Sequence, residues 1–131
     1  MKLTDNEMKF LLKSQQGELD AVLMYKALAE KVKDDRDAEA FRQLAADEGR
    51  HATVLKGITN QVLKPKKTMA RIMPLLYTIL GRKRLYRLIA KGEYAAIAKY
   101  RPYVERFPEM ESVKKDERRH GDVVMGLLTN G

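Results

Sequence analysis

The pentapeptide DEGRH, residues 47–51, recurs almost unchanged as DERRH at residues 116–120. The chain contains two histidines, and these two stretches hold both of them. In each copy a glutamate precedes the histidine by three residues, Glu48 before His51 and Glu117 before His120. Residues three apart on an α-helix project from the same face. If both copies are helical, each directs one carboxylate and one imidazole to the same place.

Amphipathic patterns around both copies predict helices. Strong helix formers dominate the sequence, and apolar residues recur at spacings of three and four over about 4–33, 36–63, 85–107 and 109–129. Short breaks at Lys33–Asp34–Asp35 and Phe107–Pro108–Glu109 separate the two helices of each pair, which favours antiparallel neighbours. The connection over 64–84 is long enough to run the length of a bundle. We therefore predict an all-α, antiparallel four-helix bundle with a long helical crossover between its second and third helices.

Length, cysteine content and charge narrow the class of protein. A chain of 131 residues suits a single domain, 1–131, and the absence of cysteine excludes disulfides and thiolate metal sites. The opening MKLTDNEMKF has acidic residues where a signal peptide needs basic and then apolar ones, so we expect a cytoplasmic location. The net charge is +8, and its excess lies in 64–87, which holds no acidic residue. No nucleic-acid partner is expected, because no reading helix or aromatic–basic platform is evident.

Carboxylates occupy the predicted inward faces, where a bundle normally places leucines. The polar residues on these faces are Glu18 in the first helix, Glu48 and His51 in the second, Glu93 in the third, and Glu117 and His120 in the fourth. An unpaired buried carboxylate costs several kcal/mol, and no Lys or Arg lies on these faces. Two divalent cations would remove this cost. We therefore predict that four glutamates and two histidines bind a pair of metal ions.

The two halves of the chain carry the same pattern. Gly17–Glu18, Tyr25 and DEGRH match Gly92–Glu93, Tyr100 and DERRH, which indicates pseudo-repeats at about 4–63 and 85–129. Each tyrosine follows the first glutamate of its half by seven residues, or two helical turns. Each could simply pack in the core, or its hydroxyl could orient a carboxylate and pass a proton or electron.

Three other polar residues near the pattern are expected to lie at its edge. Arg50 and Arg119, which directly precede the histidines, are expected to face solvent. Gln15 lies one turn before Glu18 and could orient a carboxylate, although we favour a partly exposed polar edge.

With these residues in place, the sequence resembles a rubrerythrin-type member of the ferritin-like superfamily of di-iron carboxylate proteins. The resemblance covers nearly the whole chain. It implies that Glu18 and His51 are terminal ligands of one iron, Glu93 and His120 of the other, and that Glu48 and Glu117 bridge both. Manganese or zinc would accept the same donors.

The sequence also departs from that family. Ala96 stands where rubrerythrins usually carry a further glutamate, so the remaining six-ligand set is more like the ferroxidase centre of bacterioferritin. The rubredoxin-like tail is absent, which implies an external electron donor such as rubredoxin.

The resemblance implies a non-haem di-iron oxidoreductase that reduces hydrogen peroxide or dioxygen. The alternative is a ferroxidase or iron-handling protein, either free or membrane-associated. A metal-free interaction bundle is a third class, and it requires the core glutamates to be exposed or paired with cations. The nine-residue apolar stretch 72–80 is flanked by basic residues. It is expected to cover the bundle or form a homodimer interface, and a peripheral contact of 66–87 with an anionic membrane is the other interpretation.

Overall fold

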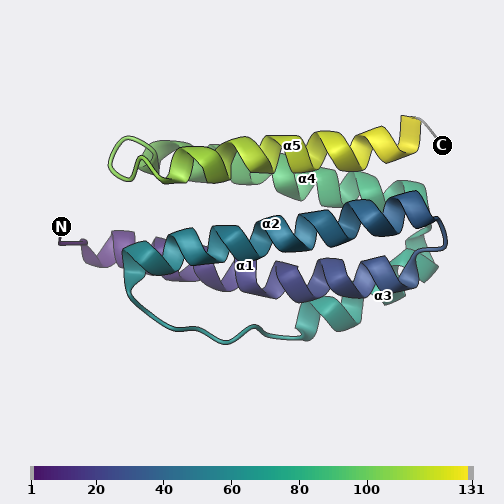
Figure 1. The fold of residues 1–131 in the computed structure, drawn as a ribbon, viewed down its shortest axis with the longest axis horizontal. Helices are drawn as coiled ribbons and strands as arrows, with labels where there is room; N and C mark the ends of the chain where they lie inside the picture. The colour runs from purple at the N-terminus through teal and green to yellow at the C-terminus, as the bar shows by residue number, and fades with distance from the viewer. Residues whose placement is uncertain (1, 130–131) are drawn as a thin grey trace.

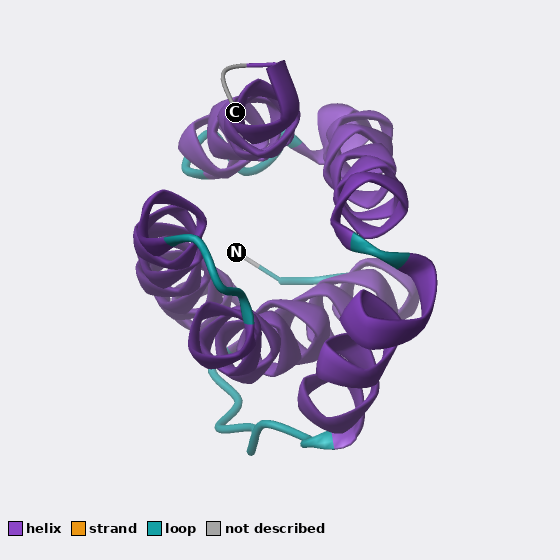
Figure 2. Cartoon of the chain, turned by 90° about the vertical axis from the view of Figure 1, so that its right-hand side faces the viewer, coloured by secondary structure: helices purple, strands orange, loops and turns teal. Residues whose placement is uncertain are grey.

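The computed structural model describes residues 2–129, and the helices within this range form two antiparallel hairpins with a fifth helix outside them (Figure 1). The elements are α1 (Asp5–Lys31), α2 (Asp35–Thr59), α3 (Thr68–Leu80), α4 (Arg82–Tyr100), the 3₁₀ helix η1 (Arg101–Tyr103) and α5 (Met110–Thr129). The α1–α2 and α4–α5 hairpins lie as two layers, joined where α2 packs on α5, while α3 packs on α1 (Figure 2). The predicted all-α bundle with a helical crossover is confirmed.

Side-chain caps define the beginnings of α1 and α2. The Thr4 side chain accepts a hydrogen bond from the Glu7 backbone N–H at 3.1 Å, and the Glu7 carboxylate accepts one from the Thr4 backbone N–H at 2.8 Å. Asp34 caps α2 by accepting from the backbone N–H groups of Arg36 and Asp37. Such caps satisfy amides that have no intrahelical partner. The turn predicted at Lys33–Asp34–Asp35 is therefore confirmed.

Two predicted helix ends were wrong, and each has a local cause. The second helix ends at Thr59 rather than near residue 63, because Asn60 adopts a left-handed conformation with φ 57°. The third begins at Arg82, directly after Gly81 with φ 86°, and ends at Tyr100 rather than near residue 107. Pro102 has no backbone N–H with which to continue α4, and the chain tightens into η1 there.

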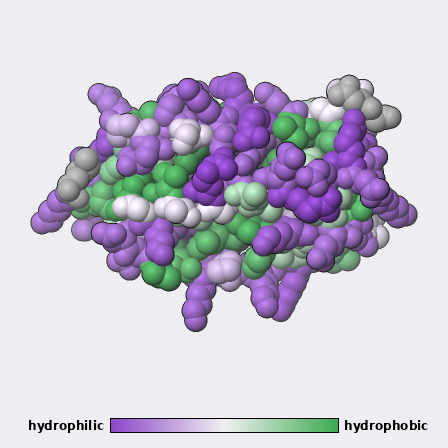
Figure 3. Space-filling model, in the orientation of Figure 1, coloured by the Kyte–Doolittle hydropathy of each residue, from purple (hydrophilic) through white to green (hydrophobic). Residues whose placement is uncertain are grey.

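The core consists of two apolar clusters with a polar layer between them. One cluster, which includes Leu28, Phe41 and Leu85, lies toward the α1–α2 turn. The other, which includes Leu11 and Met110, lies toward the α4–α5 connection. On the face shown in Figure 3, hydrophobic residues are visible mainly along the middle of the molecule and hydrophilic residues cover its outer edges. Along the bundle axis, the polar layer therefore lies between these two apolar clusters.

A buried aspartate that the sequence analysis missed joins three helices at one end of the bundle. Asp37 is fully buried and accepts hydrogen bonds from Arg82 Nε at 2.6 Å and from the Tyr86 hydroxyl at 2.6 Å. Arg82 also donates to the Leu127 carbonyl oxygen at 2.8 Å. Burial alone would raise the pKa of Asp37, but the hydrogen bonds from Arg82 and Tyr86 lower it below its usual value. This network links α2, α4 and the end of α5.

Gln15 is buried rather than partly exposed, so that expectation was wrong. Its amide nitrogen donates to the Gln61 carbonyl oxygen at 2.8 Å, and its amide oxygen accepts from the Thr59 hydroxyl at 2.6 Å. Gln15 therefore ties α1 to the end of α2. Among the described residues, no helix is both long and apolar enough to span a bilayer.

Candidate metal centre

Six side chains from four helices converge in the polar layer, and none is more than 6% exposed. Their nitrogen and oxygen atoms form two groups, within each of which the atoms lie at most 4.8 Å apart. The first group is Glu18, Glu48, His51 and Glu117, and the second is Glu48, Glu93, Glu117 and His120. Glu48 and Glu117 belong to both. The structure thus brings together all six residues that the sequence analysis selected, with the two shared glutamates from different hairpins.

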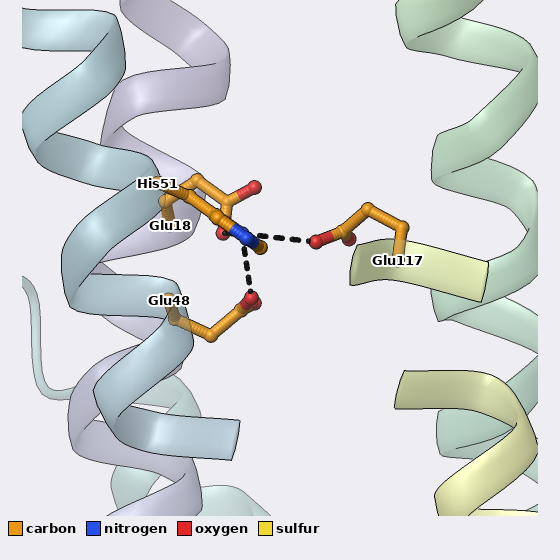
Figure 4. Close-up of side chains that lie close together, drawn as sticks. All are labelled: Glu18, Glu48, His51 and Glu117. Atoms are coloured by element: carbon orange, nitrogen blue, oxygen red, sulfur yellow. Dashed lines mark ion pairs between the residues drawn. The ribbon is translucent and has the colours of Figure 1, made fainter. Parts of the chain in front are cut away.

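Both imidazoles point the same ring nitrogen at the carboxylates. His51 Nδ1 lies 3.1 Å from Glu48 Oε1, 3.1 Å from Glu117 Oε1 and 3.5 Å from Glu18 Oε2 (Figure 4). His120 Nδ1 lies 3.4 Å from Glu48 Oε1 and 3.6 Å from Glu93 Oε1. The glutamate oxygens and these nitrogens therefore surround two common points.

The innermost atoms of this cluster lack hydrogen-bond partners. Within the described part of the chain, the buried side-chain atoms without a partner are Glu18 Oε2, Glu48 Oε1, Glu117 Oε1, His51 Nδ1 and His120 Nδ1. Leaving a buried polar atom unpaired costs roughly 1–3 kcal/mol. Carboxylate oxygen and imidazole nitrogen are ligands that iron, manganese and zinc accept. The donor set and its unsatisfied atoms fit a pair of divalent cations.

In the metal-free cluster, bound protons take the place of metal cations in neutralising the buried carboxylates. Burial raises the pKa of Glu117 to about 9, reinforced by the nearby carboxylates of Glu18 and Glu93 and opposed by the His51 hydrogen bond. Burial favours neutral His51, but the carboxylates of Glu117, Glu18 and Glu48 raise its pKa far above the usual value. The cluster thus holds protons at neutral pH, and these must leave when a cation binds.

A second pair of carboxylates, which the sequence analysis missed, orients the histidines. His51 Nε2 lies 2.8 Å from Asp116 Oδ2, and His120 Nε2 lies 2.9 Å from Asp47 Oδ2. Because an ionised carboxylate only accepts hydrogen bonds, each Nε2 carries a proton, so a neutral imidazole in this position would present its Nδ1 lone pair to a bound cation. Each aspartate belongs to the opposite hairpin from its histidine. The sequence feature that could have indicated these two aspartates is the Asp that precedes Glu in both pentapeptides.

Arg50 and Arg119 reach both aspartates, so the expectation that they simply face solvent was incomplete. Their side chains are 56% and 49% exposed, yet Arg50 lies 2.9 Å from Asp47 and 2.6 Å from Asp116. Arg119 lies 2.6 Å from Asp47 and 3.2 Å from Asp116. Burial opposes the change, but hydrogen bonds from His120, Arg119 and Arg50 lower the pKa of Asp47 to about 2. Two arginines and two aspartates therefore close the α2–α5 side of the site.

Tyr25 and Tyr100 donate hydrogen bonds across the two layers. The Tyr25 hydroxyl on α1 donates to Glu93 Oε1 on α4 at 2.5 Å, and the Tyr100 hydroxyl on α4 donates to Glu18 Oε1 on α1 at 2.8 Å. Burial, followed by the nearby carboxylates, raises the pKa of both tyrosines, which keeps them protonated. Both also pack in the core, where the Tyr25 ring stacks on Phe41 at 5.8 Å. The two interpretations of these tyrosines are thus compatible.

The comparison with protein families agrees with this geometry. The family model described as Rubrerythrin matches residues 9–128, which include both hairpins and the crossover. The chain belongs to the rubrerythrin family. Comparisons with curated proteins and with solved structures produced no match. The fold is accordingly the all-α, ferritin-like bundle of that family, and the buried carboxylate–histidine cluster lies where this rubrerythrin-family chain could bind metal.

In this member of the rubrerythrin family, a groove leads to the cluster from the side opposite the arginines. It has a volume of about 740 Å³, lies between α1 and α4, and is lined by Glu18, Glu48, Glu93 and Glu117. Small residues, Gly17 and Ala21 on α1 and Gly92 and Ala96 on α4, also form its walls. Among the described residues the backbones of α1 and α4 do not approach each other as closely as those of α2 and α5, and the Tyr25 and Tyr100 side chains bridge the wider gap. Small reactants can therefore approach the carboxylates along this groove.

Proposed function

We propose that the protein is a non-haem di-iron oxidoreductase that reduces hydrogen peroxide or dioxygen. The observation that carries the proposal is the pair of atom groups sharing Glu48 and Glu117, with unsatisfied oxygen and nitrogen atoms facing inward. The proposed ligands are Glu18, Glu48, His51, Glu93, Glu117 and His120. Two ferrous ions bound there would supply two electrons to one O–O bond. Manganese or zinc remains compatible with the same donors.

The surrounding residues suit this chemistry. Tyr25 holds a proton at Glu93 Oε1, within the cluster where the proposed reduction would consume protons. The groove admits small reactants, while the apolar clusters on both sides exclude bulk water along the bundle axis. The sequence has no cysteine with which to hold a rubredoxin-type iron centre beside the proposed di-iron site, so we propose an external electron donor such as rubredoxin. A cytoplasmic location and a homodimer stay predictions.

A ferroxidase or iron-handling role is the second candidate. The observation that favours it is Ala96, which lines the groove beside the glutamates and supplies no further carboxylate. Ferrous iron bound by four glutamates and two histidines would then be oxidised at the site. The additional carboxylate that would support repeated reduction of peroxide is missing. The two candidate functions differ in whether the protein consumes peroxide repeatedly when an electron donor is present.

Stopped-flow spectroscopy on anaerobically prepared, Fe(II)-loaded protein tests the proposal. We expect oxidation by hydrogen peroxide or dioxygen faster than that of free Fe(II). Continued peroxide consumption in the presence of reduced rubredoxin would support the oxidoreductase, and a single round of iron oxidation would support the ferroxidase. Protein that binds two ferrous ions and oxidises them no faster than buffer would contradict both.

Removal of the Asp116 carboxylate should weaken metal binding. In Asp116→Ala, His51 loses the acceptor at its Nε2 and can rotate or change tautomer. Outer carboxylates of this kind typically contribute 10–100-fold to affinity, and we expect roughly that loss, measured by competition with a chromophoric chelator. Glu111→Ala is the matched control, because Glu111 is an acidic residue of the same helix whose one ion pair within residues 2–129 is with nearby Lys114. Equal affinities in the two variants would exclude this role for Asp116.

A larger side chain in the groove wall should slow the reaction while leaving the metal content unchanged. Ala96→Leu places a branched side chain beside the glutamates that line the groove. We expect roughly a tenfold slower reaction with peroxide, about 1.4 kcal/mol in activation free energy, at an unchanged iron-to-protein ratio. Ala98→Leu serves as the control, because Ala98 is exposed on the same helix. If both variants react at the wild-type rate, reactants do not use this groove.

A further inference from the structure

The exposed apolar residues of this protein are concentrated on one segment. Of the seven large hydrophobic residues exposed in the described part of the chain, five lie on α3 and the first turns of α4. They are Met69, Ile72, Leu75, Ile79 and Leu88, exposed by 40–66%. Ile72, Leu75 and Ile79 are spaced by three and four residues and therefore share one side of α3. The neighbouring side of α3 is occupied, because Met73 is buried in the core cluster and Leu76 packs against it.

Unpaired cations surround these residues. The seven cations Lys64, Lys66, Lys67, Arg71, Lys83, Arg84 and Arg87 are all exposed, and residues 64–87 contain no Asp or Glu. Within residues 2–129, none of the seven forms an ion pair. Arg82 differs, because Asp37 and the Leu127 carbonyl oxygen bind it. An apolar ridge with a positively charged border is the pattern of helices that lie in the interface of an anionic bilayer.

The same charges argue against a second copy as the occupant. In a twofold dimer built on this surface, the same patch of each protomer would face its partner. The seven cations of one copy would then lie near those of the other, with no acidic residue of 64–87 to neutralise them. A surface rich in anionic headgroups neutralises them directly.

We propose that α3, the preceding loop and the first turns of α4 form a docking surface for an anionic lipid bilayer. Ile72, Leu75 and Ile79 enter the headgroup–acyl boundary together with Leu88, and the seven cations contact phosphate groups around them. The α1 side of α3 stays packed on the bundle, so docking requires no unfolding. None of these residues belongs to the metal-binding cluster, although Met69 and Leu88 also line the groove that leads to it. Occupation of the surface does not depend on the proposed redox activity.

Co-sedimentation of the full chain with lipid vesicles tests this proposal. We expect little binding to phosphatidylcholine alone, strong binding when phosphatidylglycerol is included, and loss of binding as salt is added. Leu75→Glu with Ile79→Glu, and separately Arg84→Glu with Arg87→Glu, should each lower the partition coefficient at least roughly tenfold. All four side chains are exposed, and an unchanged helical circular dichroism spectrum and metal content would show that the variants fold.

The control is a charge reversal of equal size elsewhere. Lys115→Glu with Arg118→Glu changes two exposed cations of α5 and should leave vesicle binding close to that of the wild type. If this control loses vesicle binding to the same degree, the net charge of the protein, rather than the proposed surface, determines binding, and the proposal is overturned. Binding that does not respond to phosphatidylglycerol would overturn it as well. So would a dimer in light scattering that Leu75→Glu with Ile79→Glu dissociates, because that result assigns the ridge to a contact between copies.

Discussion

Glu48→Gln is expected to weaken binding of the metal pair more than roughly 100-fold and, at the same time, to make the metal-free protein more stable. Glu48 belongs to both atom groups, so its replacement removes a charged donor from each. Outer-shell partners alone contribute 10–100-fold, and a ligand contributes more. In the absence of metal the same carboxylate is a buried acid beside three others. A neutral isostere should therefore raise the free energy of unfolding by about 2 kcal/mol at neutral pH.

The pH dependence of that stabilisation follows from the direction of the pKa shift. Burial, together with the carboxylate of Glu18, raises the pKa of Glu48 well above its usual 4.5 in the folded protein. Below pH 4.5 both folded and unfolded states hold the proton, so the metal-free wild type and Glu48→Gln should be close in stability. As the pH rises above 4.5 the unfolded chain ionises first, and the wild type loses stability relative to the variant.

Metal analysis by mass spectrometry and urea unfolding in the presence of a chelator check both halves of this prediction. Glu39→Gln is the control, since Glu39 lies on the same helix with its side chain 58% exposed, and it should change neither quantity. Retention of two metal ions by Glu48→Gln, or a metal-free variant less stable than the wild type, would contradict the assignment of Glu48.

Asp37→Asn should lower the free energy of unfolding by roughly 3 kcal/mol, the typical cost of breaking a buried ion pair. Arg82 would keep its charge without its carboxylate partner, and the Tyr86 hydroxyl would lose a charged acceptor. Urea unfolding measures the effect. Arg42→Ala, which breaks the exposed pair with Glu39, is the control and should cost under about 0.5 kcal/mol.

The stability difference between Asp37→Asn and the wild type should depend on pH in the opposite sense to that of Glu48. Because the pKa of Asp37 is lowered in the folded protein, its contribution is fully present above the ordinary value of 3.8. The difference should shrink as the pH falls below 3.8 and through the lower pKa of the folded state. A difference that stays constant at low pH would show that packing, rather than the charge of Asp37, stabilises this end of the bundle.

The six central residues could be predicted because their pattern is local. Glu and His three residues apart share a helix face, and Glu18 and Glu93 interrupt apolar stripes that otherwise face the core. The positions of the turns near Asp34 and Pro108 then bring the glutamates of each hairpin to the same depth. Helix ends were less accurate, because the left-handed Asn60 and the proline at position 102 override a periodicity that continues past them.

The partners of the histidines could not be predicted in the same way. Asp47 and Asp116 each bond to a histidine of the other hairpin, and the pairing exists only because α2 packs on α5. Asp37 gave no signal either, since its arginine partner lies on the far side of a long crossover. Such contacts depend on how two hairpins dock, which no single helical repeat encodes.

Local periodicity, capping residues and the two copies of one pentapeptide were enough to determine an all-α chain with two similar hairpins and a carboxylate on the inner face of each long helix. The tertiary structure alone decided that α2 and α5 close one side of the cluster, that the α1–α4 side stays open as a groove, and that Nδ1 of each histidine faces inward. The physical reason is the difference in sequence separation between the residues that determine each feature. A helix and its inner face follow from residues within about two turns of each other, whereas the spacing between hairpins depends on side chains from all four helices packing together.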